Sequence, residues 1–474
     1  MNKSADAVLI VPPSPYPGMS MLFPSLTTTD PLGIGYLISY LKKKGINKVY
    51  GLNLYNGLKN INRFSEYIKR KKPKVVGFST MTENYNNGIR LARIVKNILP
   101  STTVVMGGPH VTFTDEETLL ESCVDVVVRH EGEITFYELL DCILGGRCDL
   151  SKVDGITYKE NNQIVKNKHR NFIKNLDVLP FPERNLPDID GILMKLKEIT
   201  PSRNVVITTR GCPGGCKFCA ATAMSGGTYR MRSVEDVIEE CNYISSLSKN
   251  NEIFFGDDTI TANVGRLMTL LKYLRKGKIK WAAESRVDVI TPELAKEIVK
   301  AGCIGLQFGV ESGDQRVLDR MGKGITLVQV ENAIKYVIDA GLNPVSVACS
   351  FMIGIPGDTR KSVKKTLKFI KYLQDKYGIA AVIGITVPYP GTYIWRFPEK
   401  SGILRIVEQS YERFSVDNPV MDLENLTHEE IRALYYDYVV ESIHHPTRYQ
   451  KSLFQHFHKR KGNYYGEIQK IYFE

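Results

Sequence analysis

The stretch that decides the fold is Cys212-Pro213-Gly214-Gly215-Cys216-Lys217-Phe218-Cys219, which follows the apolar run at 205–208. Its three cysteines have C-x3-C-x2-C spacing in a glycine-containing loop after a predicted strand, a pattern typical of a metal site. Structural zinc takes four ligands, and no local fourth ligand is evident because Cys241 falls in a helical pattern. Three thiolates suit a 4Fe-4S cluster with one open iron, whereas zinc would need a distant fourth residue. Free thiols are the third interpretation.

Upstream of this loop, short apolar runs alternate with helical patterns. The runs cover 7–11, 49–54, 75–78, 103–106 and 124–128, and they lack strict polar alternation. Such runs are typical of strands buried on both faces of a parallel sheet. We therefore predict a doubly wound α/β domain over residues 1–150.

Ligands of doubly wound domains bind beyond the carboxyl ends of the strands. Gly33 and Gly35 form only a lone G-x-G, so a dinucleotide fingerprint is absent and nicotinamide binding is disfavoured. Small residues at several strand ends instead favour a broad, flat ligand. The candidate residues at these ends are Thr80, Met81, Thr82, Gly107, Gly108, His110, Glu131, Gly132 and Glu133.

Residues 151–195 are interpreted as a linker, in which apolar runs around the turn at 160–162 predict a hairpin. A second α/β series then occupies 196–395. Its predicted strands are 205–208, 252–255, 280–283, 305–310, 345–353 and 381–387. Six βα units in succession predict a partial barrel, whose chemistry gathers at the carboxyl ends of the strands.

The remaining segment, 396–474, predicts a helical cap, in which His444, His445, His456 and His458 are interpreted as packing or solvated residues. With 474 residues and 43% hydrophobic content, the chain is expected to fold into two or three soluble domains. No signal peptide or membrane span is recognised, and the nine cysteines do not form a disulfide framework, so we expect a cytoplasmic protein. The net charge of +12 is interpreted as solvated helix ends rather than a nucleic-acid surface.

The cysteine loop on the first strand of a six-unit barrel resembles the radical S-adenosylmethionine (SAM) superfamily. The five-stranded domain before it resembles the cobalamin-binding domain of the cobalamin-dependent, class B methyltransferase-like members. The resemblance covers roughly residues 5–395. It implies a 4Fe-4S cluster, SAM and cobalamin as cofactors.

Site residues follow from the resemblance position by position. Cys212, Cys216 and Cys219 would ligate the cluster, whose open iron would be chelated by SAM. Asp257 and Asp258 would lie by the methionyl amino group, Arg286 by its carboxylate and Glu311 by the ribose. Further SAM contacts are expected at Glu284, Ser312, Gly354, Pro356 and Gly357, and the strand-end residues of the first domain would contact cobalamin.

One departure from other cobalamin proteins is the missing D-x-H-x-x-G motif, whose histidine would ligate cobalt from below. We expect an empty or water-filled lower axial position with Thr80 to Thr82 nearby, and a corrin or tail contact for His110.

The resemblance implies that the enzyme cleaves SAM to a 5′-deoxyadenosyl radical and methylates an unactivated carbon of a small-molecule or peptide substrate. Non-methylating rearrangement or cyclisation uses the same cofactors and stays open. A methylthiotransferase acting on RNA is less favoured because Cys123, Cys142 and Cys148 do not form a second cluster motif. A nucleic-acid binder with a structural metal is the non-enzymatic alternative.

The expected partners are a substrate bounded by Tyr389 and Tyr393 and an electron donor such as flavodoxin or ferredoxin. We expect a monomer and no nucleic-acid partner.

Overall fold

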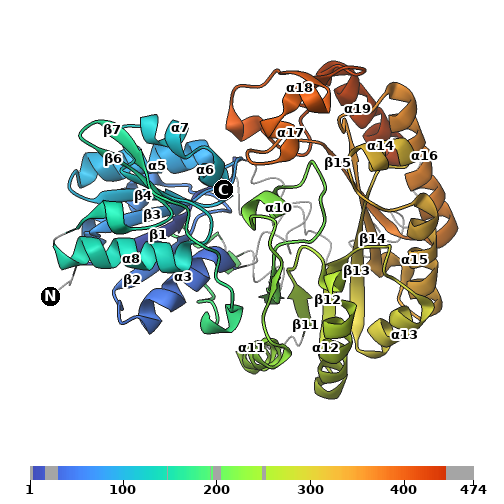
Figure 1. The fold of residues 1–474 in the computed structure, drawn as a ribbon, viewed down its shortest axis with the longest axis horizontal. Coiled ribbons are helices and arrows are strands. Elements are labelled where there is room, and N and C mark those ends of the chain that lie inside the picture. The colour runs from blue at the N-terminus through green and yellow to red at the C-terminus, as the bar shows by residue number, and fades with distance from the viewer. Residues whose placement is uncertain are drawn as a thin grey trace. The chain divides into compact units, whose positions relative to one another are not determined.

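The computed structural model describes residues 4–15, 30–146, 148–192, 194–195, 204–247 and 252–444 (Figure 1). The predicted cap segment beyond residue 444 lies outside these residues. They divide into two compact units, one extending to residue 195 and the other beginning at Asn204.

The first unit is built on a seven-stranded sheet of order β2-β1-β3-β4-β5-β6-β7. The first five strands are parallel, as the apolar runs predicted. The hairpin of β6 and β7 extends the same sheet with antiparallel pairing. The strands are β1 (Ala7–Val11), β2 (Val49–Asn53), β3 (Val75–Ser79), β4 (Thr103–Gly107), β5 (Val126–Val128), β6 (Ile156–Glu160) and β7 (Gln163–Lys166).

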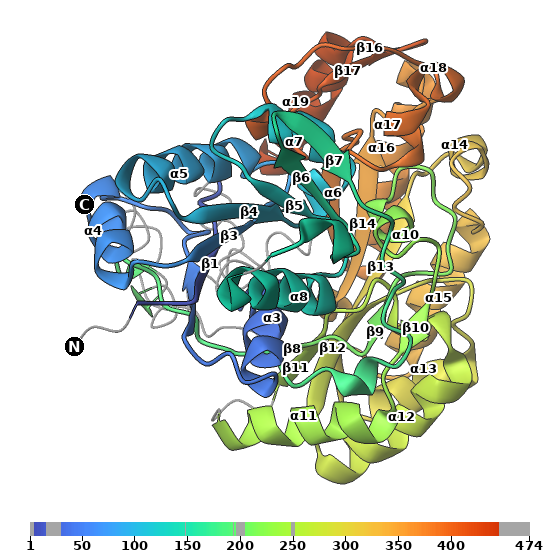
Figure 2. The same ribbon diagram turned by 60° about the vertical axis from the view of Figure 1, so that its left-hand side comes forward.

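Helices of the first unit connect the parallel strands. Helix α3 packs against α8, and α4 packs against α5 (Figure 2). Buried side chains of α3, α8 and the strands form one continuous core that includes Ile38, Val105 and Leu139. The helices are α3 (Leu32–Lys43), α4 (Ile61–Lys71), α5 (Tyr85–Ile98), α6 (Pro109–Phe113), α7 (Asp115–Leu120) and α8 (Gly132–Gly145).

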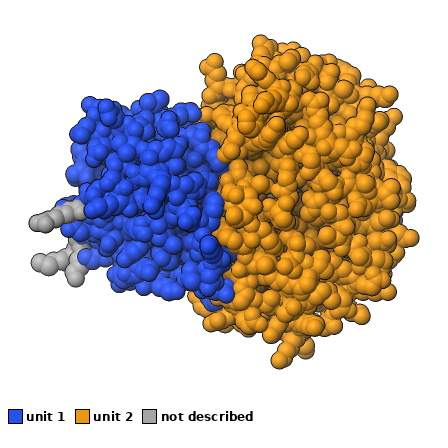
Figure 3. Space-filling view, viewed as in Figure 1, with its two compact units in different colours: residues 1–203, 465–474 blue, residues 204–464 orange. Residues whose placement is uncertain are grey.

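The second unit, drawn in orange in Figure 3, contains a six-stranded parallel sheet. Its order, β8-β11-β12-β13-β14-β15, follows the chain, and β8 and β15 lie at opposite edges. This open sheet confirms the predicted partial barrel. The strands are β8 (Asn204–Val206), β11 (Glu252–Phe255), β12 (Lys280–Ser285), β13 (Cys303–Glu311), β14 (Val347–Ile353) and β15 (Ala380–Ile385).

Burial alternates along the central strands of this sheet. Trp281, Phe308 and Phe351 face the helices and are almost fully buried, whereas alternate residues such as Glu284 and Gln307 are only partly buried. One face therefore packs on helices, and the other carries polar groups. The helices are α11 (Val234–Leu247), α12 (Val264–Gly277), α13 (Pro292–Lys300), α14 (Gln315–Arg320), α15 (Leu327–Asp339) and α16 (Arg360–Tyr377).

The C-terminal part of the second unit mixes helices and strands. Its described elements are α17 (Tyr393–Arg396), α18 (Pro398–Ser401), β16 (Ile403–Ile406), β17 (Met421–Leu423) and α19 (His428–His444). The sequence predicted helices alone, but β16 and β17 pair antiparallel. None of the described helices has the length and apolar character required to cross a bilayer.

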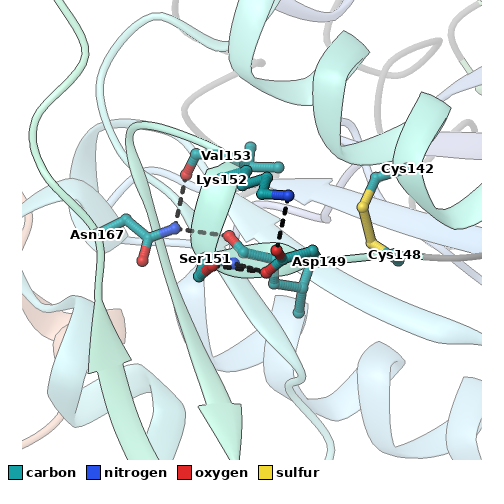
Figure 4. Close-up of a disulfide and its surroundings, with 8 residues drawn as sticks. Cys142, Cys148, Asp149, Ser151, Lys152, Val153 and Asn167 are labelled. Atoms are coloured by element: carbon teal, nitrogen blue, oxygen red, sulfur yellow. Dashed lines mark hydrogen bonds and ion pairs between the residues drawn. A yellow bond between two sulfur atoms is a disulfide. The ribbon is translucent and has the colours of Figure 1, made fainter.

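Cys142 at the end of α8 and Cys148 form a disulfide (Figure 4). Asn167 braces the segment between the disulfide and β6 by donating to the carbonyls of Leu150 (2.7 Å) and Val153 (2.8 Å). The sequence predicts no disulfide framework, and this single disulfide is not foreseen by it. The spacing of the two cysteines carries no pairing signal, because only the reversal of the chain after α8 brings the two Cα atoms within 4.6 Å.

Candidate functional site

The cysteine loop leaves β9 (Thr209–Arg210), a short strand that pairs antiparallel with β10 (Arg230–Met231). Gly211 begins the loop with φ +89°, and a Cβ there would lie 2.1 Å from the Thr228 carbonyl oxygen. Only glycine fits this close approach. Cys219 ends the loop and occupies the N-cap position of α10 (Ala220–Met224) without a side-chain capping hydrogen bond. The local backbone therefore fixes both ends of the C-x3-C-x2-C stretch.

The thiols flank Gly214. A Cβ built on this glycine would lie 3.3 Å from the Cys212 sulfur and 4.0 Å from the Cys216 sulfur. Burial raises the pKa of the Cys216 thiol, although Lys323 and Arg286 oppose the rise, and burial raises the pKa of Cys219 to about 11. No group of three or more histidine, cysteine or acidic side chains in the described residues is already arranged to hold a metal ion.

The donor set nevertheless fits an iron-sulfur cluster better than zinc. Three partly buried thiols stand in one eight-residue loop whose glycines leave space between them. Fully ligated zinc would require a fourth donor. A cluster held by three thiolates keeps an open iron, and the nearby cations suit the negative charge that thiolates bring.

Asp257 supports the cluster loop from below. Its buried carboxylate accepts hydrogen bonds from the backbone nitrogens of Thr208 (2.6 Å) and Thr209 (3.0 Å) and from the Thr208 hydroxyl (2.5 Å). Arg266 also donates to the Thr208 hydroxyl, at 3.1 Å. This network joins Thr208 and Thr209, which follow β8, to Asp257, which follows β11. Thr209 lies two residues before the loop begins at Gly211.

Asp258 differs from its neighbour. Its side chain is solvent-accessible, yet surrounding protein partly desolvates it and raises the pKa of its carboxyl group. Burial also raises the pKa of Glu284 on β12, with smaller increases from Asp258 and Glu311. The structure thus brings Asp258, Glu284 and Glu311 together at the carboxyl ends of three neighbouring strands.

We expect Asp257→Ala to affect stability and Asp258→Ala to affect SAM binding. The first leaves three buried donors without their acceptor and should lower the free energy of unfolding by roughly 3 kcal/mol. The second should leave stability unchanged but weaken SAM binding about tenfold, through loss of one charge-assisted hydrogen bond. Thermal unfolding and equilibrium binding of SAM separate the two. Equal stability losses in both variants would contradict the division of roles.

Lys323 is the residue of this site that sequence reasoning missed. Its ammonium group donates to Glu311 at 2.8 Å, and both side chains are at least 88% buried. A Cβ at Gly309 would lie 2.7 Å from the Glu311 carboxylate and 2.9 Å from the Lys323 nitrogen, so the glycine makes room for the pair. Lys323 follows a helix in a polar turn. The sequence signal for it is its place between two glycines in Met321-Gly322-Lys323-Gly324, and both glycines have positive φ in the structure.

Glu311 itself has φ +75°, a backbone conformation rarely adopted by residues other than glycine. It ends β13 at a register shift in the pairing with β14. Such strain persists where the surrounding structure enforces it, and it is concentrated at functional sites.

The other predicted SAM residues have identifiable partners. Arg286 forks onto Asp288 through two 3.0 Å bonds and donates to the Lys323 carbonyl, while lying 3.7 Å from the Cβ position of Gly214. Ser312 is buried and bonds to Thr366. Gly354 and Gly357 both have positive φ, and Pro356 between them is buried.

The predicted substrate residues follow β15, with Tyr389 in the loop after that strand and Tyr393 at the start of α17. Tyr389 is partly buried and donates weakly to the Phe414 carbonyl (3.4 Å). Tyr393 is 39% exposed, with its ring 5.0 Å from that of Phe397 and 5.5 Å from the Lys217 ammonium group.

In the first unit, the loops after β3 and β4 contact each other through backbone atoms. Gly108 has φ +101° and ψ 178°, and a Cβ there would lie 2.5 Å from the Thr80 carbonyl oxygen. Gly107 has no neighbour closer than 3.7 Å to its Cβ position. Met81 is 54% exposed beside them. Open backbone and an exposed apolar side chain at strand ends fit a large flat ligand such as a corrin.

His110 lies behind these loops. Its ring is 99% buried, 3.2 Å from the Thr82 hydroxyl and 4.3 Å from the Tyr85 ring. Burial lowers the pKa of His110 to about 3, so the ring stays neutral. Glu131 accepts from the Ile173 nitrogen at 2.8 Å, Gly132 begins α8, and Glu133 is buried. Met81 is therefore the most exposed of the predicted cobalamin residues, and Gly107 is partly exposed.

We expect Gly108→Ala to abolish cobalamin binding. The backbone conformation is nearly exclusive to glycine and should cost roughly 1–3 kcal/mol, to which the clash with Thr80 adds. Absorbance of cobalamin retained after gel filtration measures the loss. Gly145→Ala is the matched control because nothing lies within 4 Å of its Cβ position. Normal cobalamin retention in Gly108→Ala would remove this loop from the binding site.

Comparison with known proteins bears on both units. Residues 206–370 match the family model "Radical SAM superfamily", and residues 22–140 match "B12 binding domain". An uncharacterized methyltransferase of Pyrococcus horikoshii is 36% identical over 91% of both chains. A cytidylyl-2-hydroxyethylphosphonate methyltransferase of Streptomyces wedmorensis is 25% identical, over 86% of this chain and 84% of its own.

A third relative carries a different name. The anaerobic magnesium-protoporphyrin IX monomethyl ester cyclase of Rubrivivax gelatinosus is 29% identical, over 72% of this chain and 62% of its own. Among solved structures, the cobalamin-dependent SAM radical enzyme OxsB, with aqua-cobalamin and SAM bound, has the same fold. Its TM-score is 0.71 at 18% identity, over 97% of this chain and 71% of its own.

Proposed function

Because the chain belongs to the cobalamin-dependent radical S-adenosylmethionine enzymes, we propose that it methylates an unactivated carbon of a small-molecule or peptide substrate. The observation that carries this proposal is the combination, in one chain, of a three-cysteine cluster loop and a cobalamin-type domain with an open strand-end loop. Two relatives that align over most of their length are named methyltransferases, which supports the same reaction class.

The residues described above divide the work of holding the cofactors. Cys212, Cys216 and Cys219 would ligate the cluster. Asp258 and Glu284 would accept hydrogen bonds from the SAM ammonium group, and cationic Lys323 and Arg286 suit its carboxylate. In the first unit, Gly107 and Met81 would lie against the corrin.

When bound, these cofactors supply one-electron cleavage of SAM to the 5′-deoxyadenosyl radical and a methyl group for transfer. The chain contributes orientation and exclusion of water. The Glu311–Lys323 pair is largely buried and its geometry is enforced by the backbone, so it can fix the position of a ligand at low entropic cost.

Cyclisation is the second candidate function, favoured by the relative named a cyclase. Nothing in the cluster loop distinguishes the two outcomes, because both would begin with the same radical. Methylthio transfer is disfavoured, since Cys142 and Cys148 pair with each other and leave only buried Cys123 in the first unit. A flavodoxin or ferredoxin donor, a monomeric state and a cytoplasmic location stay predictions.

The test is anaerobic reconstitution followed by an assay with candidate substrates. We expect about four irons per chain, one bound cobalamin, 5′-deoxyadenosine as a product and a substrate heavier by one methyl group, with two SAM molecules consumed. A product that loses hydrogen or keeps its mass would support cyclisation or rearrangement. Absence of 5′-deoxyadenosine would overturn both.

A further inference from the structure

The outer side of the cluster loop adjoins a surface that includes none of the predicted cluster, SAM or cobalamin residues, although it includes Tyr393, a predicted substrate residue. The Lys217 backbone nitrogen donates to the Met321 carbonyl (3.1 Å), and the Lys217 carbonyl accepts from the Ile394 backbone nitrogen (3.3 Å). The loop is thereby joined to the turn after α14 and to α17. Pro213 and Gly215, between the cysteines, are exposed.

Cations and aromatic rings gather on this surface. Phe397 is 42% exposed and its ring is tilted against that of Tyr393, while the Lys400 ammonium group lies 5.2 Å from the Phe397 ring. The Arg320 side chain is 41% exposed. We call this surface the cationic–aromatic patch; it comprises Lys217, Arg320, Tyr393, Arg396, Phe397 and Lys400.

We propose that the cationic–aromatic patch is the docking surface for an acidic one-electron carrier protein that reduces the cluster. This inference rests on the proposed function, which needs one electron from outside for each SAM cleavage. In the docking step the carrier loses one electron, the cluster gains it, and no bond forms or breaks.

Charge and position favour this occupant. The patch carries four cations, and the acidic residues Asp319, Glu399 and Glu424 adjoin it, the last 3.6 Å from Arg320. The positive excess attracts an acidic partner and opposes pairing with a second copy of the same surface. Aromatic and arginine side chains are enriched in protein interfaces. Redox partners form small interfaces, so a patch of this size is sufficient.

The first experiment measures binding rather than turnover. Calorimetric titration of the reconstituted protein with an acidic flavodoxin should show affinity that falls as salt rises. Arg396→Glu/Lys400→Glu should raise Kd at least about tenfold and flatten the salt dependence. Phe397→Ala should raise Kd while the salt dependence stays as in the wild type. Far-ultraviolet circular dichroism checks that each variant folds.

A matched control places the same charge change elsewhere. Lys69→Glu/Arg70→Glu alters one exposed lysine and one exposed arginine on α4 of the other unit. Unchanged flavodoxin affinity in the patch variant, or an equal loss in this control, would overturn the docking surface. Preferred binding of nucleic acid over flavodoxin at the patch would overturn it as well.

The second experiment separates this inference from the function on which it rests. Flavodoxin-driven formation of 5′-deoxyadenosine should fall about tenfold in the patch variant, while dithionite-driven formation stays unchanged, because a small reductant needs no docking surface. Equal rates with both reductants in the patch variant would overturn the inference. Failure of the wild-type protein to cleave SAM with dithionite would count against the proposed function, and the binding titration would still decide the docking surface.

Discussion

Cys216→Ala is expected to eliminate SAM cleavage altogether. Removing one of three thiolates leaves two ligands for a cluster that needs at least three. The reconstituted variant should therefore bind less than a quarter of the iron that the wild type binds. The loss should exceed 10³-fold in rate, because the cluster is the group that would supply the electron for SAM cleavage. Iron analysis and 5′-deoxyadenosine quantification measure the two effects.

Cys241→Ala is the control for this prediction. Cys241 is a fully buried cysteine in α11 that is in no disulfide, so its loss creates a small cavity and should lower stability by about 1 kcal/mol without changing the iron content. Full activity in Cys216→Ala, or loss of iron in Cys241→Ala, would contradict the assignment of the cluster loop.

Lys323→Met is expected to lower kcat/KM for SAM by about 10²-fold, which corresponds to about 2.7 kcal/mol of binding or transition-state energy. It removes a buried cation from beside Cys216 and Glu284 and leaves Glu311 buried without its partner. Breaking one member of a buried pair costs roughly 3–5 kcal/mol of stability, so the variant should also unfold at a lower temperature.

The double variant Glu311→Gln/Lys323→Met separates ligand binding from folding. It removes both charges, so much of the lost stability should return. Activity should stay low if the pair contacts SAM. Recovery of both stability and activity in the double variant would show that the ion pair serves the fold alone.

The sequence predicted the framework because its signals are local. The apolar runs gave all five parallel strands of the first unit and all six of the second, and the turn at 160–162 gave the hairpin of β6 and β7. A strand that is buried on both faces of a parallel sheet is a short apolar run in the sequence. Each strand could therefore be recognised without knowledge of its neighbours.

The site was only partly predictable because its contacts join distant positions. Asp257 and Asp258 are adjacent and chemically identical, yet the Asp257 carboxylate accepts hydrogen bonds from Thr208, whereas Asp258 faces solvent. Lys323 gains its role from an ion pair with Glu311 twelve residues earlier. The burial of His110 likewise depends on Tyr85 in another helix. None of these distinctions exists before the chain folds.

The most direct test of carbon methylation uses SAM with a trideuterated methyl group. The reconstituted protein and reductant would be incubated with metabolite extracts of cells that lack the protein, and the mass spectra compared. We predict a new product that carries one trideuteromethyl group on carbon and depends on cobalamin and on Cys212, Cys216 and Cys219. A product that forms without the label, or a labelled product that forms equally without cobalamin, would contradict the account.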